Sequence, residues 1–267
     1  SQFEYVSVEM IYQPEIADAI KSSIFNFSKF KTFVTIPSSK SSIKPKAFFG
    51  LVSLKMIDIP STITSFGDFA FYECSSLSQI TIPPSVTSIG KGAFYGCSLL
   101  TQISIPTSVS VIKDMTFYRC KSLKTIDIPS SITSFGDLAF YECSSLSQIV
   151  IPSSVTSIGR GAFEKCFLLK QLAIPSSIKL IQESTFSECS SLKQISIPSS
   201  LDTIEEYAFY SCWSLKGISI PPSVRWIGEN AFEGCSSLTQ ISIPSSIKLI
   251  EKCLFSKCRS LTQIDIH

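Results

Sequence analysis

The chain has 267 residues, of which 44% are hydrophobic and 16% are charged, and its formal net charge is +2. This composition is ample for a packed core and excludes a disordered tail. The absence of long like-charge runs argues against a nucleic-acid partner, and the absence of an apolar run of about 18 residues predicts no membrane span in this chain.

Residues 1–32 lack the regular spacing that marks the rest of the chain. Apolar residues at Ile16, Ile20, Ile24 and Phe27 lie close to helical spacing. We therefore predict an N-terminal cap over residues 1–32, helical in structure. A degenerate copy of the repeat described next is the alternative.

Residues 33–267 carry a repeat of 23 residues that is held without insertion or deletion. It is marked by Pro at 37, 60, 83, 106, 129, 152, 175, 198, 221 and 244. Phe and Leu recur at the same spacing, from Phe48 to Phe255 and from Leu54 to Leu261. A fixed period of this length indicates a solenoid of about ten coils, in which each unit buries its apolar side against its neighbours.

Within one unit, residues 77–82 read as a short strand that ends at Pro83, because proline cannot donate a ladder hydrogen bond. One such strand per coil predicts a parallel sheet. We expect the Gly90 position to need a positive φ, and we expect Ala93, Phe94 and Cys97 to form a short helical or 3₁₀ wall. The predicted fold class is an α/β-type solenoid with one short parallel strand per 23-residue coil.

The unit that runs from Ile151 to Ala173, with its I-P-S-S-V-T-S-I-G segment, resembles the BspA-like leucine-rich repeat family. The resemblance covers about Phe33 to Ile266. It implies a right-handed leucine-rich repeat solenoid. Members of this family in anaerobic bacteria and parasitic protists are largely cell-surface or secreted proteins implicated in adhesion to host matrix proteins or host cells. The resemblance thus implies a cell-surface adhesin or antigen with a protein ligand.

Nine of the ten cysteines follow the repeat, from Cys74 to Cys258. One cysteine per coil forms a line, which suits neither converging metal ligands nor a disulfide between parallel side chains, so we predict buried reduced thiols. Such thiols favour a reducing compartment, and the alternative function is an intracellular scaffold or regulator that binds a cytosolic protein. Cys253 lies off this line and is a candidate for an exposed thiol.

The residues needed for the commonest enzyme chemistry are missing from the repeats. The single histidine is His267, the last residue, and the acidic pair Glu205 and Glu206 falls on an expected solvated turn. We therefore predict no catalytic, cofactor or metal site.

Candidate binding residues are those in the repeat that core packing does not explain, and solenoids usually bind with the concave face. That face is predicted to carry a column of glutamines and, beside it, a basic edge. Its candidates are Gln148, Gln171, Gln194, Lys170, Lys193 and Lys216. Stacked glutamines that only stabilise the solenoid, and a merely solvated lysine edge, are the alternatives.

Large aromatic side chains replace the usual serine at three places in the repeats. Phe167, Trp213 and Trp226 are costly to leave exposed, and aromatic anchors are common in interfaces, so we predict that they contact the partner.

The chain as given stops at the close of a strand without a polar capping layer. We expect either further chain or a second copy, in an end-to-end homodimer through the C-terminal coil, to cover this end.

Overall fold

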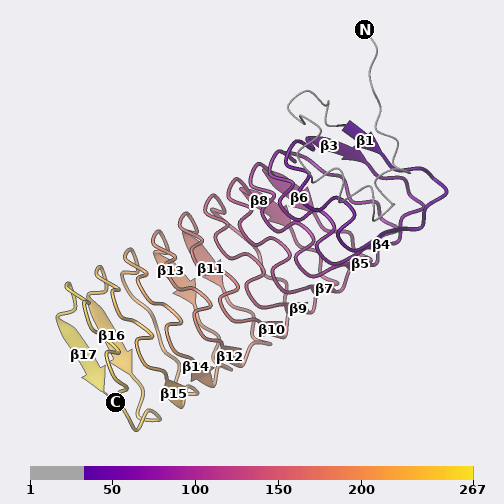
Figure 1. Ribbon diagram of the computed structural model, residues 1–267. Helices are drawn as coiled ribbons and strands as arrows, with labels where there is room; N and C mark the ends of the chain where they lie inside the picture. Colours follow the sequence, from indigo (N-terminus) through magenta and orange to yellow (C-terminus); the bar gives the residue numbers. More distant parts are fainter. Residues whose placement is uncertain (1–32, 267) are drawn as a thin grey trace.

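A computed structural model describes residues 33–266, and in Figure 1 these residues form an elongated stack of similar coils. The predicted parallel-strand solenoid is confirmed. The cap expected over residues 1–32 lies outside the described residues.

The first ladder consists of the strands that precede the repeat prolines, and they lie along one long side of the stack (Figure 1). They are β1 (Phe33–Thr35), β3 (Met56–Asp58), β6 (Gln102–Ser104), β8 (Thr125–Asp127), β11 (Gln171–Ala173), β13 (Gln194–Ser196), β16 (Gln240–Ile243) and β17 (Gln263–Ile266). Strand pairs are parallel with a register of one repeat, as in Gln171 opposite Gln194. In all but the first of the three-residue strands the central side chain is buried between two exposed ones, as in β11.

A second ladder, which the sequence reading did not predict, follows the opposite long side (Figure 1). It consists of β2 (Ser42–Ile43), β4 (Ser65–Phe66), β5 (Ser88–Ile89), β7 (Val111–Ile112), β9 (Ser134–Phe135), β10 (Ser157–Ile158), β12 (Leu180–Ile181), β14 (Thr203–Ile204) and β15 (Trp226–Ile227). Each of these strands has only two residues, of which the second is buried and the first faces outward. These strands also pair in parallel at one repeat, so two strands, not one, contribute to most coils.

The wall that carries the Ala-Phe pair is made of turns, and no helix occurs among residues 33–266. Local turn bonds, such as Tyr72 N–H to the Phe69 carbonyl at 3.2 Å, alternate with bonds to the next coil, such as Phe71 N–H to the Ala93 carbonyl at 2.8 Å. Helical φ/ψ angles would turn these amides back into their own coil, and the expected helical or 3₁₀ wall is therefore wrong. The bonds between coils satisfy backbone groups that a buried turn would leave unpaired.

Two positions in every turn wall have a positive φ, and most of them are not glycine. Phe69, Leu138 and Tyr207 adopt φ values of 57°, 56° and 56°. A positive φ is unfavourable for such bulky residues, so the repeated bonds to the next coil must impose it.

Gly90, where we expected a positive φ, has none. A Cβ built at this residue would lie 2.4 Å from the Asp68 backbone nitrogen of the preceding coil. Close approach between two coils, and not a left-handed turn, is therefore what favours glycine here.

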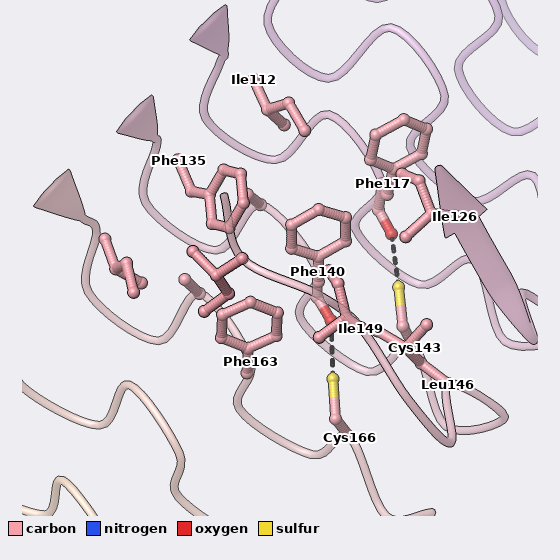
Figure 2. Close-up of a cluster of buried hydrophobic side chains, with 14 of the residues drawn as sticks. Ile112, Phe117, Ile126, Phe135, Phe140, Cys143, Leu146, Ile149, Phe163 and Cys166 are labelled. Atoms are coloured by element: carbon pink, nitrogen blue, oxygen red, sulfur yellow. Dashed lines mark hydrogen bonds between the residues drawn. The ribbon is translucent and has the colours of Figure 1, made fainter. Parts of the chain in front are cut away.

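The core runs through the whole stack as one continuous cluster. Its centre is a column of fully buried phenylalanines, and Figure 2 shows Phe117, Phe140 and Phe163 one above the other. Neighbouring rings are nearly parallel, with centroids 5.5 Å and 5.2 Å apart for these two pairs. Isoleucines of both ladders close the core from the two long sides. This rigid core fixes each outward side chain at a definite place on the surface.

Candidate functional site

The outward residues of the first ladder form a flat polar surface, which we call the strand face. Two of its columns lie four and five residues before each repeat proline. In the middle coils they contain the six Lys and Gln candidates of the sequence analysis, and all six are exposed.

A depression of about 650 Å³ lies on the strand face. It is lined by Ser147, Gln148, Lys170, Gln171, Lys193, Gln194, Lys216 and Gly217. The structure thus brings the three lysines and three glutamines together around one hollow, which we call the Lys-Gln groove. Their role in binding stays a prediction.

Gly217 is the residue of the groove whose importance sequence reasoning missed. It occupies the place that Gln171 and Gln194 hold in the two preceding coils. A Cβ built at Gly217 would meet no atom within 4 Å, and the φ of this glycine is not positive. Because glycine has no side chain, Gly217 interrupts the Gln column and leaves one end of the groove open. The interruption of that column is the sequence signal that could have revealed it.

The lysines of the groove have no carboxylate partner among the described residues. Several lysines elsewhere are paired, such as Lys121 with Glu142 at 2.9 Å and Lys257 with Glu233 at 2.8 Å. Three like charges in consecutive coils, about 5 Å apart from coil to coil, repel one another. The groove is therefore a local concentration of positive charge on a protein of small net charge.

The structure separates the three aromatic candidates. Phe167 and Trp213 lie at the same repeat position, two coils apart, and their exposed fractions are 36% and 57%. Leu168, which sequence reasoning did not single out, is also exposed. Each aromatic residue lies three positions before a lysine of the groove, Lys170 or Lys216. Phe167, Leu168 and Trp213 are thus exposed within three residues of Lys170 or Lys216, and we call them the apolar edge.

Trp226 lies elsewhere, in β15 of the second ladder. It is half-buried, and its indole Nε1 donates a hydrogen bond to Glu251 Oε1 at 3.0 Å. Because Trp226 is bound to Glu251 and lies on the second ladder, it does not belong to the same surface as Phe167 and Trp213.

The tyrosines that follow the core phenylalanines form a second aromatic column along the turn wall. Phe49, Tyr72, Tyr95, Tyr118 and Tyr141 stack with ring centroids 4.3 to 4.6 Å apart. At the end of this column, Lys165 Nζ donates a hydrogen bond to the Tyr141 hydroxyl at 2.7 Å. All five rings are half-buried, and their stacking against one another covers part of each ring.

The nine repeat cysteines are unpaired, and eight of them are buried. Each thiol donates to the carbonyl of the phenylalanine 26 residues earlier, and Figure 2 shows this bond for Cys143 and Cys166. Burial raises the pKa of the Cys74 thiol to about 12 and that of Cys143 well above the ordinary range. Because a reactive cysteine needs the thiolate, these thiols are inert near neutral pH. Cys253, the cysteine off the column, is exposed.

The acidic pair takes part in joining the coils. The Glu205 carboxylate accepts a hydrogen bond from the Glu183 backbone N–H at 2.9 Å, and Glu206 is half-buried on the same turn. Within the described part of the chain, no cluster of three or more His, Cys, Asp or Glu residues could hold a metal ion.

The last described coil leaves apolar side chains uncovered. Ile264 and Ile266 of β17 are 46% and 70% exposed. The end-to-end homodimer stays a prediction, for which these side chains would supply the contact. Among residues 33–266 no helix is long and apolar enough to span a bilayer.

Comparison with known proteins identifies the repeat. A family model described as BspA type leucine rich repeat region matches in six copies, over residues 1–124, 65–193 and 156–267. Among curated proteins, none matches the chain.

Solved structures of bacterial leucine-rich repeat proteins are similar. One from Bacteroides ovatus is 29% identical with a TM-score of 0.71, over 79% of this chain and 69% of that one. A leucine rich cell surface protein from Faecalibacterium prausnitzii is 30% identical with a TM-score of 0.56, over 90% of this chain and 80% of that one. The pneumococcal vaccine antigen PcpA is 25% identical with a TM-score of 0.63, over 88% of this chain and 68% of that one. The chain belongs to the BspA type leucine-rich repeat family.

Proposed function

We propose that this chain is a non-enzymatic scaffold that binds a protein through the Lys-Gln groove of its strand face. The observation that carries the proposal is the meeting of six outward polar residues around one hollow, three of them lysines that form no ion pair within residues 33–266. Buried polar contacts and complementary charge give a flat surface its specificity, and the rigid core presents these groups in a fixed arrangement.

We further propose that the scaffold acts at the cell surface, as an adhesin or antigen that contacts host matrix proteins or host cells. The similar proteins support this location, because one is described as a cell surface protein and another as a vaccine antigen. The column of reduced thiols is compatible with an oxidising location outside the cell. Eight of those thiols are shielded in the core, where an external oxidant does not reach a thiolate.

Substitution of Gly217 by glutamine tests the groove directly. The substitution continues the Gln column, meets no atom at Cβ and leaves the three lysines in place, so the fold is retained while one end of the hollow fills. We expect Gly217→Gln to lose most of the protein that the intact chain retains from a host-matrix extract. Thr125→Gln is the matched control, because Thr125 occupies the same column in β8, outside the groove, and is exposed.

Circular dichroism spectra of both variants would establish that they are folded. Equal retention of the same matrix proteins by the intact chain and Gly217→Gln would place binding outside the groove. The intact chain could instead retain proteins only from a cytosolic extract and lose them in Gly217→Gln. That result would favour the intracellular scaffold over the adhesin.

A further inference from the structure

We infer that the Lys-Gln groove and the apolar edge together bind an extended acidic peptide segment that carries an aromatic or large aliphatic residue. This inference rests on the proposed function and specifies the chemistry of the partner. It joins two surfaces that come from separate columns of the repeat and meet in the same coils.

The charge of the strand face changes along the solenoid. Two residues before the repeat proline, Asp58 and Asp127 place carboxylates on the strand face of earlier coils. In the four coils of the groove that position is held by Val150, Ala173, Ser196 and Ser219. The lysines of the groove therefore face no acidic neighbour on their own sheet, and a row of carboxylates from a partner would complement them.

The spacing of the lysines suits an extended chain that runs along the solenoid axis. Lys170, Lys193 and Lys216 occupy consecutive coils and so span about 10 Å, at about 4.8 Å per coil. An extended peptide advances about 3.4 Å per residue, so a segment of about four residues spans the three lysines. Flexible lysine side chains can then reach carboxylates on successive or alternate residues. Gln171 and Gln194 lie beside them and can donate to, and accept from, the backbone of the peptide.

The apolar edge favours a peptide over a sulfated glycan. Phe167 and Trp213 are in the first and third of the three lysine coils, and the small Ser190 holds the same position in the coil between them. The two backbone positions are thus about 10 Å apart along the axis, and a partner side chain can lie between them over Ser190. A glycan polyanion would use the lysines alone, whereas a peptide can place an apolar residue here next to its acidic run.

Fluorescence anisotropy with labelled probes tests this inference on the intact chain. The probes are an oligoglutamate peptide, the same peptide with two phenylalanines at one end, and a heparin oligosaccharide of similar charge. The variants are Lys170→Gln with Lys193→Gln and Lys216→Gln, and separately Phe167→Ser with Trp213→Ser, since serine is the usual residue at that position. Lys55→Gln with Lys124→Gln is the matched control, because these lysines share the column but lie outside the groove.

We expect the phenylalanine-containing peptide to bind more tightly than oligoglutamate. The triple lysine variant should lose about tenfold in affinity for both peptides at low salt, and this loss should shrink at high salt as the charges are screened. The aromatic variant should lose about tenfold only for the phenylalanine-containing peptide. The control variant should bind as the intact chain does.

Two results would overturn the inference. In one, heparin binds more tightly than either peptide, and its binding is unchanged by the aromatic substitutions. That result would assign the groove to a sulfated glycan. The other is no binding of either peptide by the intact chain. If matrix-protein retention still depended on Gly217 in that case, the proposed function would stand and only the acidic peptide would be wrong.

Discussion

The folded chain is expected to lose stability steeply as the pH rises above about 9, because unfolding exposes thiols that the core holds protonated. The pKa of Cys74 is raised by burial from an ordinary value near 9 to about 12, and those of Cys97 and Cys120 are raised well above the ordinary range. A thiol with a raised pKa in the folded state contributes its full stability below the unfolded pKa. Above it the unfolded chain releases the proton first, and the stability is lost as the pH approaches the folded pKa.

The size of this effect follows from the length of the column. Each buried thiol removes up to about 1.4 kcal/mol of unfolding free energy per pH unit within that window. Eight cysteines are buried, so together they remove up to about 11 kcal/mol per pH unit, as much as the whole stability of a typical domain. Burial also raises the pKa of Tyr95 and Tyr118, which adds to the loss in the same direction.

Urea unfolding followed by circular dichroism at a series of pH values from about 7 to about 11 would measure this dependence. Cys143→Ala is the matched variant, since it removes one buried thiol from the middle of the column. Its stability should fall less steeply, by about 1.4 kcal/mol per pH unit between pH values of about 10 and 11. A stability that stays constant to a pH of about 11 would contradict the assignment of protonated, buried thiols.

Replacement of Phe140 by alanine is expected to cost about 3 to 5 kcal/mol of unfolding free energy. The ring is fully buried and lies between Phe117 and Phe163, with the edge of Phe135 at a centroid distance of 5.5 Å. A cavity in the middle of the column removes contacts with the coils on both sides. The loss of unfolding free energy should therefore exceed the loss caused by truncating a core side chain in a terminal coil, which has a neighbouring coil on one side only.

The adjacent residue supplies the control for this substitution. Tyr141 is half-buried in the outer aromatic column, and serine holds its position at Ser187 and Ser256. Tyr141→Ser should cost about 1 to 2 kcal/mol, from one stacking contact and one hydrogen bond to Lys165. Urea unfolding would compare the two variants. Equal losses would mean that the inner phenylalanine column does not dominate the packing.

The regular 23-residue spacing was enough to predict the coils and their first ladder, because Ile126 and its equivalents alternate with polar neighbours as a half-buried strand does. The second ladder was harder to foresee, since a pair such as Ser134 and Phe135 is too short to show a period of two. Its pairing comes from the stacking of coils, not from the local sequence.

The turn wall could not be predicted from residue preferences. Leu138 and Tyr207 have a positive φ that their side chains disfavour, and bonds such as Leu138 N–H to the Arg160 carbonyl hold them there. Tertiary pairing therefore overrides the local preference, and the helical reading of this segment was wrong for that reason.

The candidate surface was partly predictable. The columns of Lys193 and Gln194 follow from the repeat alone, but the open end of the hollow depends on the missing side chain of Gly217. Its positive charge depends on a lining that contains lysines and no Asp or Glu. Trp226 shares its residue type with Trp213, although its repeat position is that of the outward residues of the second ladder. The repeat position, not the residue type, therefore decides which surface a tryptophan joins.

Site-specific photo-cross-linking would test most directly which face of the solenoid touches a protein partner. A photoreactive amino acid would be placed at Gln171 in the Lys-Gln groove or at Ser157 in β10, which is exposed on the second ladder. The intact fold of each labelled chain would be checked, and both would be irradiated on host-matrix protein. We predict cross-links from Gln171 and none above background from Ser157. Cross-links from Ser157 alone would contradict the assignment of the strand face as the binding surface.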